Sequence, residues 1–326
     1  MNSVFPRKID VASFLFAALL ASFAANSQPV FPPRQINVVV PMAGGTADVL
    51  ARLVAPKLAQ ALSTTVIVDS RPGAGGNIAT DHVAKGPQDG SLLLVGVNAP
   101  LVVNNTLFKN LPYDPVRDFS PVTMGVSTSQ YLVVHPSLPV YSVKDFVAYV
   151  KAHPGFPYAS VGTGGASHLT MEMFRTQADL QMTHVPYRGA GPALTDLVAG
   201  NVKAAFLVPG NALPYVASGR LRLIASSGRQ RVAATPDVPT MIESGFDNFE
   251  AIAWIGFLVR SGTPSSVVQR YHGELTKILQ MPEVRTRLAE MQFEVAPGTP
   301  GAFSAFMKEE IARWGAVIKA TGVTAE

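Results

Sequence analysis

Short apolar runs rich in β-branched residues alternate with segments of helical periodicity along this chain, and that alternation restricts the folds it can adopt. The run 36–40, INVVV, precedes a helical pattern over 47–62, and a second apolar run, TTVIVD, follows at 64–69. A glycine-rich turn, RPGAGG, and a helical piece, NIATDHVAKG, then lead to the run SLLLVGV. Strands that alternate with helices predict the α/β class, in which crossover helices join parallel strands that are buried on both faces.

The first helical pattern has one apolar face and one interruption. Apolar side chains recur with the spacing of a single helix face, at Leu50, Leu53, Val54, Leu58 and Leu62. Pro56 lies inside this pattern. We expect a kink or a break there, because proline removes a backbone donor and crowds the preceding turn.

A second block of the same kind follows the run YLVVHP. Its first helical pattern opens at Ser142, with Asp145 three residues later, and stops before Pro154, which predicts a capped helix. The segments PYASV, HLTMEMFRTQA, MTHVPY, GPALTDLVAG and VKAAFLV then alternate strand with helix. An apolar run at 250–260 precedes two helical patterns, which we expect to cover the sheet of the first domain. The sequence therefore predicts two similar α/β domains, with the chain crossing between them more than once.

Composition and motifs exclude several classes of function. Hydrophobic residues make up 48% of the 326 residues and charged residues only 15%, which is typical of a well-cored protein of about two domains. The net charge of +4 comes without a basic run, so we expect no nucleic-acid partner. The chain has no cysteine, and its six histidines lack the H-E-x-x-H spacing. A G-x-S-x-G elbow is also absent, so we assign no catalytic residue, no metal ligand and no cofactor.

The N-terminal segment has the pattern of a secretory signal peptide. Arg7 and Lys8 precede an apolar stretch, 11–25, which ends in small residues. An uncleaved membrane anchor is the alternative, but about 15 apolar residues are fewer than the roughly 20 needed to cross a bilayer. We expect residues 1–27 to be the signal peptide, with cleavage between Ala24 and Gln28, and the exported protein to be periplasmic.

Two glycine turns each follow a predicted strand and precede a predicted helix. The first contains Gly44 and Gly45, and the second contains Gly162, Gly164 and Gly165. In an open α/β sheet ligands bind at this edge, where helix N-termini present free N–H groups and a partial positive charge. Two such turns facing across a cleft favour binding of a carboxylate or phosphate by main-chain amides; the alternative is that the glycines only form tight turns. Neither turn has the dinucleotide or P-loop spacing, and we expect the RPGAGG turn to line the cleft.

Several side chains near these turns can each be interpreted as having one of two roles. We expect Asp48 to cap the first turn, because a carboxylate there binds free N–H groups but would repel an anionic ligand. His168 follows the second turn, where it either caps and packs or contacts the ligand. Arg188 is either a surface charge or a group near the cleft. Trp254 and Trp314 lie in apolar surroundings, which predicts core packing for both.

Six segments occur in order along the chain: VVVPMAGGTADVLARLVAPKL, VIVDSRPGAGGNIA, LPYDPVRDFSPV, YASVGTGGASHLTMEMF, HVPYRGAGPALTDLVAGNV and RQRVAATPDVPTMIESG. In this combination they resemble the periplasmic solute receptors of tripartite tricarboxylate transporters, often called Bug-type receptors after the Bordetella uptake gene family. The likeness covers nearly all of the chain from Ile36 to Ala320.

The resemblance implies a two-domain periplasmic binding protein of type II, a Venus flytrap with a ligand cleft between its domains. Domain 1 would comprise 34–130 and 256–326, and domain 2 would comprise 131–255. Such receptors are monomers that close on a small mono- or dicarboxylate and deliver it to membrane permease subunits. Carried over by position, the implied ligand-binding residues are Met42, Ala43, Gly44, Gly45, Thr46, Asp48, Asn98, Ser129, Gly162, Thr163, Gly164, Gly165, Ser167 and His168.

The sequence departs from the family pattern in the first loop. The family usually has a proline between the residue that corresponds to Ala43 and the glycine pair, whereas this chain runs directly from Ala43 to Gly44. A loop that is one residue shorter places its amides differently, which affects the size or pose of the ligand. Two other functions stay open at the level of sequence: a receptor that feeds a signalling partner, and a secreted α/β enzyme.

Overall fold

The computed structural model describes residues 31–44 and 46–324. The predicted signal peptide, 1–27, lies outside these described residues, as does Gly45. None of the helices in the described part of the chain has the length and apolar character needed to span a bilayer.

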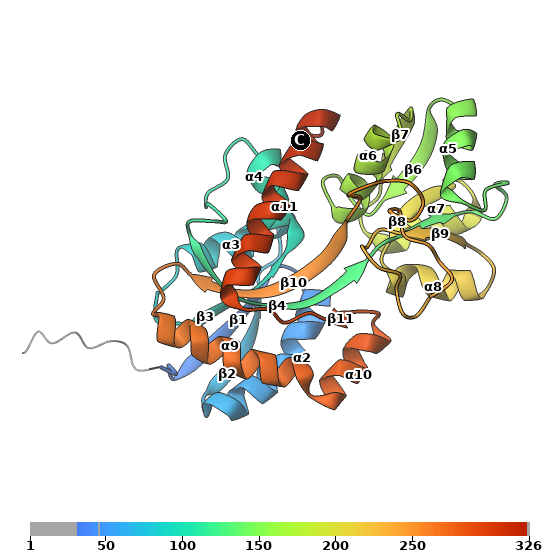
Figure 1. The fold of residues 1–326 in the computed structure, drawn as a ribbon. Helices are drawn as coiled ribbons and strands as arrows, with labels where there is room; N and C mark the ends of the chain where they lie inside the picture. The colour runs from blue at the N-terminus through green and yellow to red at the C-terminus, as the bar shows by residue number, and fades with distance from the viewer. Residues whose placement is uncertain (1–30, 45, 325–326) are drawn as a thin grey trace, which may run out of the picture.

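The chain folds around two sheets (Figure 1). The first sheet has the order β11-β4-β10-β3-β1-β2, and the second has the order β7-β6-β8-β5-β9. The strands of the first sheet are β1 (Gln35–Val40), β2 (Thr65–Ser70), β3 (Leu92–Val97), β4 (Phe119–Ser129), β10 (Ile252–Arg260) and β11 (Glu294–Val295). Those of the second are β5 (Tyr131–Val134), β6 (Phe156–Ser160), β7 (Met182–Pro186), β8 (Ala204–Leu207) and β9 (Arg222–Ser226). We call each sheet with the helices on its faces a lobe, the first lobe and the second lobe.

Helices connect the strands and cover both faces of each sheet. In the first half of the chain they are α2 (Thr46–Leu62), the short turns η1 (Ala74–Gly76) and η2 (Ala99–Val103), α3 (Asn77–Ala84), α4 (Asn104–Leu107) and α5 (Val143–Ala152). In the second half they are α6 (Ala166–Gln177), α7 (Ala190–Ala199), α8 (Pro209–Ala217), α9 (Ser265–Gln280), α10 (Pro282–Glu290) and α11 (Pro300–Thr321).

The alternation of side chains along each strand divides the apolar residues between two layers. Val38 and Val40 of β1 belong to the cluster formed with α2, α9 and α10, whereas Val39 points to the opposite face, toward α3 and α11. In the second sheet, Tyr131 packs with α7 and α8, and Leu132 packs on the side of α5 and α6. These strands are buried on both faces, as their continuous apolar runs predict.

The chain crosses between the sheets along β4 into β5 and again along β10, which lies beside β4 in Figure 1. At the first crossing, Gln130 donates its backbone N–H to the Ser227 hydroxyl and accepts from the Ser227 backbone N–H, each at 2.8 Å. The Ser227 hydroxyl in turn donates to the carbonyl of Ala251, immediately before β10. One serine therefore joins the two crossings.

The sheets are mixed, which corrects the expectation of parallel sheets. Strands β1, β2 and β3 pair in parallel, as do β6, β7 and β8. The crossing strands β4, β5 and β10 pair antiparallel with their neighbours. For β5 and β10 the reason is topological, because each enters its sheet from the other lobe with no crossover helix to restore its direction. Strand β4 is antiparallel because its partners are β10 and β11.

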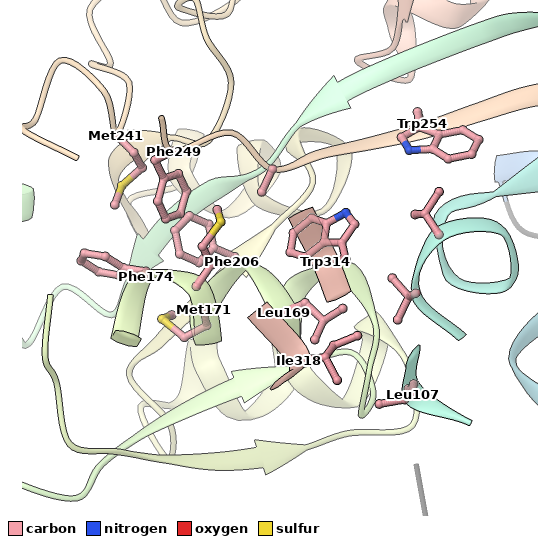
Figure 2. Close-up of a cluster of buried hydrophobic side chains, with 14 of the residues drawn as sticks. Leu107, Leu169, Met171, Phe174, Phe206, Met241, Phe249, Trp254, Trp314 and Ile318 are labelled. Carbon is pink, nitrogen blue, oxygen red and sulfur yellow. The ribbon is translucent and has the colours of Figure 1, made fainter. Parts of the chain in front are cut away.

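One hydrophobic cluster extends from one lobe to the other (Figure 2). Trp314 and Ile318 of α11 lie in it beside Leu169 of α6, with Leu107 of α4 nearby. Helix α11 therefore packs against both lobes, rather than covering the first alone as the sequence predicts.

The structure confirms some of the local predictions made from the sequence and corrects others. Helix α2 runs through Pro56 without a break, and both Pro56 and Arg52, whose carbonyl loses its helical donor, are exposed residues. The predicted cap of α5 is confirmed, since Ser142 Oγ accepts from Asp145 N at 3.1 Å. The Asp145 carboxylate accepts from Tyr141 N, also at 3.1 Å. Helix α10 is not among the helices that the sequence analysis predicts.

Two glycines face each other where β10 pairs with β3, Gly256 opposite Gly96. A Cβ on Gly256 would collide with the buried ring of Phe303. We therefore expect Gly256→Ala to lower the free energy of unfolding by about 1–3 kcal/mol, the usual cost of overpacking. Urea denaturation monitored by circular dichroism measures this change in the free energy of unfolding.

Gly273→Ala in the interior of α9 is the matched control, because a Cβ there meets no atom within 4 Å. This change should raise stability by about 0.5–1 kcal/mol through better helix propensity. Equal effects of the two substitutions would contradict the packing at Gly256.

Candidate functional site

A cavity of about 400 Å³ opens where β1 and β3 end and the chain turns into helices. The first lobe forms most of its wall, and Val208 at the start of α8 contributes from the second lobe. Its lining residues are Pro41, Met42, Thr46, Ala47, Pro72, Gly73, Gly75, Gly76, Val97, Asn98, Val208, Ala253, Trp254, Ile255 and Phe293. Within the described part of the chain, no charged side chain lines the cavity.

The first glycine loop forms one edge of this cavity. Met42 lies at the edge with 60% of its surface exposed, and Thr46 and Ala47 begin α2 at the wall. The first N–H groups of an α-helix have no partner inside the helix, so this end of α2 offers donors and a partial positive charge to an anion. The loop itself turns through Gly44, whose φ of 70° suits glycine.

The carboxylate of Asp48 stabilises the first glycine loop through a hydrogen bond. Its Oδ2 accepts from Gly44 N and from Arg52 Nε, both at 3.0 Å, and the residue is only 5% exposed. The hydrogen bond from Arg52 keeps the pKa of this carboxyl below its ordinary value. The expected capping role of Asp48 is confirmed, and the Gly44 N–H is already used by it.

The RPGAGG turn forms a second edge of the cavity, through Pro72, Gly73, Gly75 and Gly76. Gly76 has a φ of 96°, and a Cβ there would lie 3.2 Å from both Pro41 and Pro100. Glycine thus lets this turn pack closely against the first loop. The structure confirms that the turn lines the cavity.

Asn98 joins β3 to β10 at the inner wall. Its Nδ2 donates to the carbonyl of Ile252 at 3.1 Å, and its Oδ1 accepts from Trp254 N at 2.9 Å. These bonds fix the crossing strand at the cavity. Trp254 packs edge-on against Phe303 and is 1% exposed, so the predicted core packing is confirmed, although the same residue also contributes to the cavity wall.

The second glycine loop is bonded to its own surroundings. Gly162 N donates to Ser160 Oγ at 3.3 Å, Gly164 N to His168 Nδ1 at 3.0 Å, and Gly165 N to the Gly162 carbonyl at 3.2 Å. Ser167 Oγ accepts from the N–H of Val161, the residue before the loop, at 2.9 Å. A Cβ on Gly164 would approach Leu107 to 2.5 Å, so this loop lies close to α4 of the first lobe.

His168 is 3% exposed and stacks on His184, with ring centroids 3.6 Å apart. Burial lowers the pKa of His168 to about 4, and burial also lowers the pKa of His184. Both rings are therefore neutral near pH 7, and His184 Nε2 is hydrogen-bonded to Ser160 Oγ at 2.6 Å. These contacts fit the interpretation in which His168 caps the second loop and packs beside it.

A model of the "Tripartite tricarboxylate transporter family receptor" matches residues 50–323. The chain belongs to this family. Among curated relatives, Protein BugT of Bordetella pertussis is 34% identical over 311 residues, which cover 94% of this chain and 95% of BugT.

Two solved structures with bound carboxylates resemble this family member along most of its length. R. palustris Rpa4515 with adipate has a TM-score of 0.79 at 32% identity, covering 90% of this chain and 99% of that one. MatC from Rhodopseudomonas palustris with bound malate has a TM-score of 0.75 at 32% identity, covering 88% and 100%. The α/β two-sheet fold is thus that of periplasmic binding proteins of this receptor family.

Against this family fold, the residues predicted from sequence fall into four groups. Met42, Thr46 and Asn98 line the cavity, whereas Ala43, Gly44 and Asp48 shape its first loop from outside the lining. Ser129 lines a separate cavity of about 170 Å³ with Thr128 and Gln292. The second loop, 162–168, lies outside the lining of the main cavity. The roles of these residues as ligand contacts stay predictions.

Sequence reasoning missed the inner wall of the cavity. Val97, Ile255, Phe293 and Val208 come from four separate segments and carry no motif. The one available signal was that Val97 ends an apolar strand, because ligand sites in α/β sheets lie at such ends. Groups of three or more His, Asp or Glu able to hold a metal do not occur among the described residues.

We expect Asp48→Ala to lower the free energy of unfolding by about 0.5–2 kcal/mol, because the Gly44 N–H loses its acceptor and the loop loses its shape. Carboxylate affinity should fall with it. Arg52→Ala, which removes a 60% exposed partner of the same carboxylate, should cost no more than about 0.5 kcal/mol. Thermal denaturation and calorimetric titration measure both, and improved anion affinity with unchanged stability in Asp48→Ala would contradict the cap.

The buried histidine predicts acid destabilisation. The unfolded chain takes up a proton at His168 below about pH 6.5, whereas the folded protein does so only near its pKa of about 4. The stabilisation is therefore complete above pH 6.5 and is lost as the pH falls toward 4, to an extent on the order of 3 kcal/mol.

Urea denaturation at a series of pH values measures this loss. His168→Gln should show a flatter dependence over the same window, each value being compared with its own stability at pH 7.5. The exposed His153→Gln is the control and should keep the wild-type slope. A wild-type slope in His168→Gln would show that the buried ring does not control this window.

Proposed function

We propose that this chain is an extracytoplasmic receptor that binds a small organic mono- or dicarboxylate in the cavity described above. The observation that carries the proposal is the meeting of the α2 N-terminus with a cavity of about 400 Å³ at the carboxyl ends of β1 and β3. Family membership supports a receptor, and the adipate and malate in two similar structures support a carboxylate ligand.

The proposal includes closure of the two lobes as domains, 34–130 with 256–326 and 131–255. The crossings at Gln130 and Ala251 are the proposed hinges, since both are joined through Ser227. On closure the second loop, 162–168, moves toward the first loop. The donors it brings to the same carboxylate that the α2 N-terminus holds are the N–H groups of the first turn of α6, because the glycine amides before that helix are already bonded.

Export and delivery complete the proposed role. Residues 1–27 act as the signal peptide, the receptor works in the periplasm as a monomer, and it delivers its ligand to the membrane permease subunits of a tripartite tricarboxylate-type transporter. The family description supports delivery to a transporter of this kind. The receptor releases the carboxylate unchanged.

A thermal-shift screen of organic acids tests the proposal. Because a ligand that binds only the folded state stabilises it, an acid present at a hundred times its Kd should add about 2.7 kcal/mol to the free energy of unfolding. Small-angle scattering with the same acid should show a smaller radius of gyration than without it.

The primary amides of the same acids are the controls, since they keep the carbon skeleton and lack the anion. Amides should give no shift at concentrations where the acids do. Equal binding of amides and acids would refute an anion site, and conversion of any acid to a product would refute a receptor without turnover.

A further inference from the structure

The cavity wall is apolar apart from its first-loop edge and Asn98. Six side chains from five segments form this surface: Met42, Val97, Val208, Trp254, Ile255 and Phe293. The two aromatic rings come from β10 and from the connection between α10 and β11. Such a wall stabilises a ligand by removing its apolar surface from water.

The polar side chains of the lining offer few free hydrogen-bonding groups to a second charged group of a ligand. Thr46 lies at the α2 N-terminus, which is the proposed carboxylate anchor. Asn98 has an amide that is bonded at both ends to β10, and the indole N–H of Trp254 is buried without a hydrogen-bond partner. The lining holds no lysine, arginine or histidine among the described residues. A second carboxylate inside the cavity would therefore be desolvated without a cationic partner, which is costly.

Charges near the cavity are bonded to one another. Arg52, in the second turn of α2, pairs with Asp48 at 3.0 Å. Arg71, the first residue of the RPGAGG turn, pairs with Asp69 at 2.8 Å. Using either cation for a ligand would leave its acidic partner unpaired beside the anion.

We infer that the cavity selects a carboxylate with one anionic end and an apolar body, such as a medium-chain or aryl monocarboxylate, over a dicarboxylate of the same length. The inference rests on the proposed carboxylate-receptor function and names its substrate class. The α2 N-terminus holds the anionic end, and the apolar wall between Val97 and Phe293 covers the body.

Hexanoate and adipate are the matched probes, because both have six carbons and differ by the second carboxylate. Calorimetric titration at pH 7.5, where both are fully ionised, should show hexanoate binding at least tenfold more tightly than adipate. Benzoate should group with hexanoate. Adipate binding as tightly as hexanoate or more tightly overturns the inference and leaves the carboxylate-receptor function standing. If no acid binds, the proposed function fails and the inference fails with it.

A cation added to the wall should weaken or cancel the preference for hexanoate. Val208 is half-buried at the cavity, and Val208→Arg places a guanidinium on the second-lobe side. We expect the ratio of adipate to hexanoate affinity to rise at least tenfold over the wild type. Val116→Arg, at a 46% exposed position outside the cavity, should leave the ratio unchanged. An unchanged ratio in Val208→Arg overturns the inference that this neutral wall decides selectivity.

Discussion

The antiparallel pairing of β10 with both β3 and β4 organises this molecule. Strand β10 returns from the second lobe and inserts into the middle of the first sheet, where it separates β3 from β4. Two contacts fix its start: the Asn98 amide bonds to Ile252 and Trp254, and the Ser227 hydroxyl bonds to Ala251. The same strand then supplies Trp254 and Ile255 to the cavity wall. The position of the cavity and the path between the lobes therefore depend on one strand.

The two glycine turns share a local pattern, but side chains of different charge hold them in shape. Both follow a strand and precede a helix, and each has an amide held by a side chain four residues later: Gly44 by Asp48, and Gly164 by His168. The first acceptor is a carboxylate paired with an exposed arginine. The second is a neutral imidazole, buried and stacked on His184. The shape of the first loop thus depends on an ion pair and that of the second on an uncharged ring.

The cavity concentrates its polarity at one edge. Helix α2 presents N–H groups there, while the remaining side chains of the wall are apolar or already bonded. The neighbouring cations are paired with the acids Asp48 and Asp69. In the function proposed above, oriented backbone dipoles hold the anion without a salt bridge to a side chain. The rest of a ligand bound in this way would meet a surface whose contribution is mainly hydrophobic.

Local sequence by itself determined many of the helices and strands and the hydrogen bond that closes the first loop. Apolar runs and helical periodicity predicted the α/β class, Ser142 and Asp145 predicted the start of α5, and Asp48 was correctly expected to close the turn at Gly44. Each of these depends on residues within a few positions of one another, where hydrogen-bond geometry is set by the local chain.

Only the tertiary structure decided how distant segments meet. It made the sheets mixed, packed α11 against both lobes, and brought Val208, Trp254 and Phe293 to one wall from segments that share no motif. It also joined His168 to His184, 16 positions away in the chain, as a buried stack. These contacts follow from strand order and from the packing of faces against one another. Neither leaves a periodic signal in the sequence, because an apolar residue has the same pattern whether it fills a core or lines a cavity.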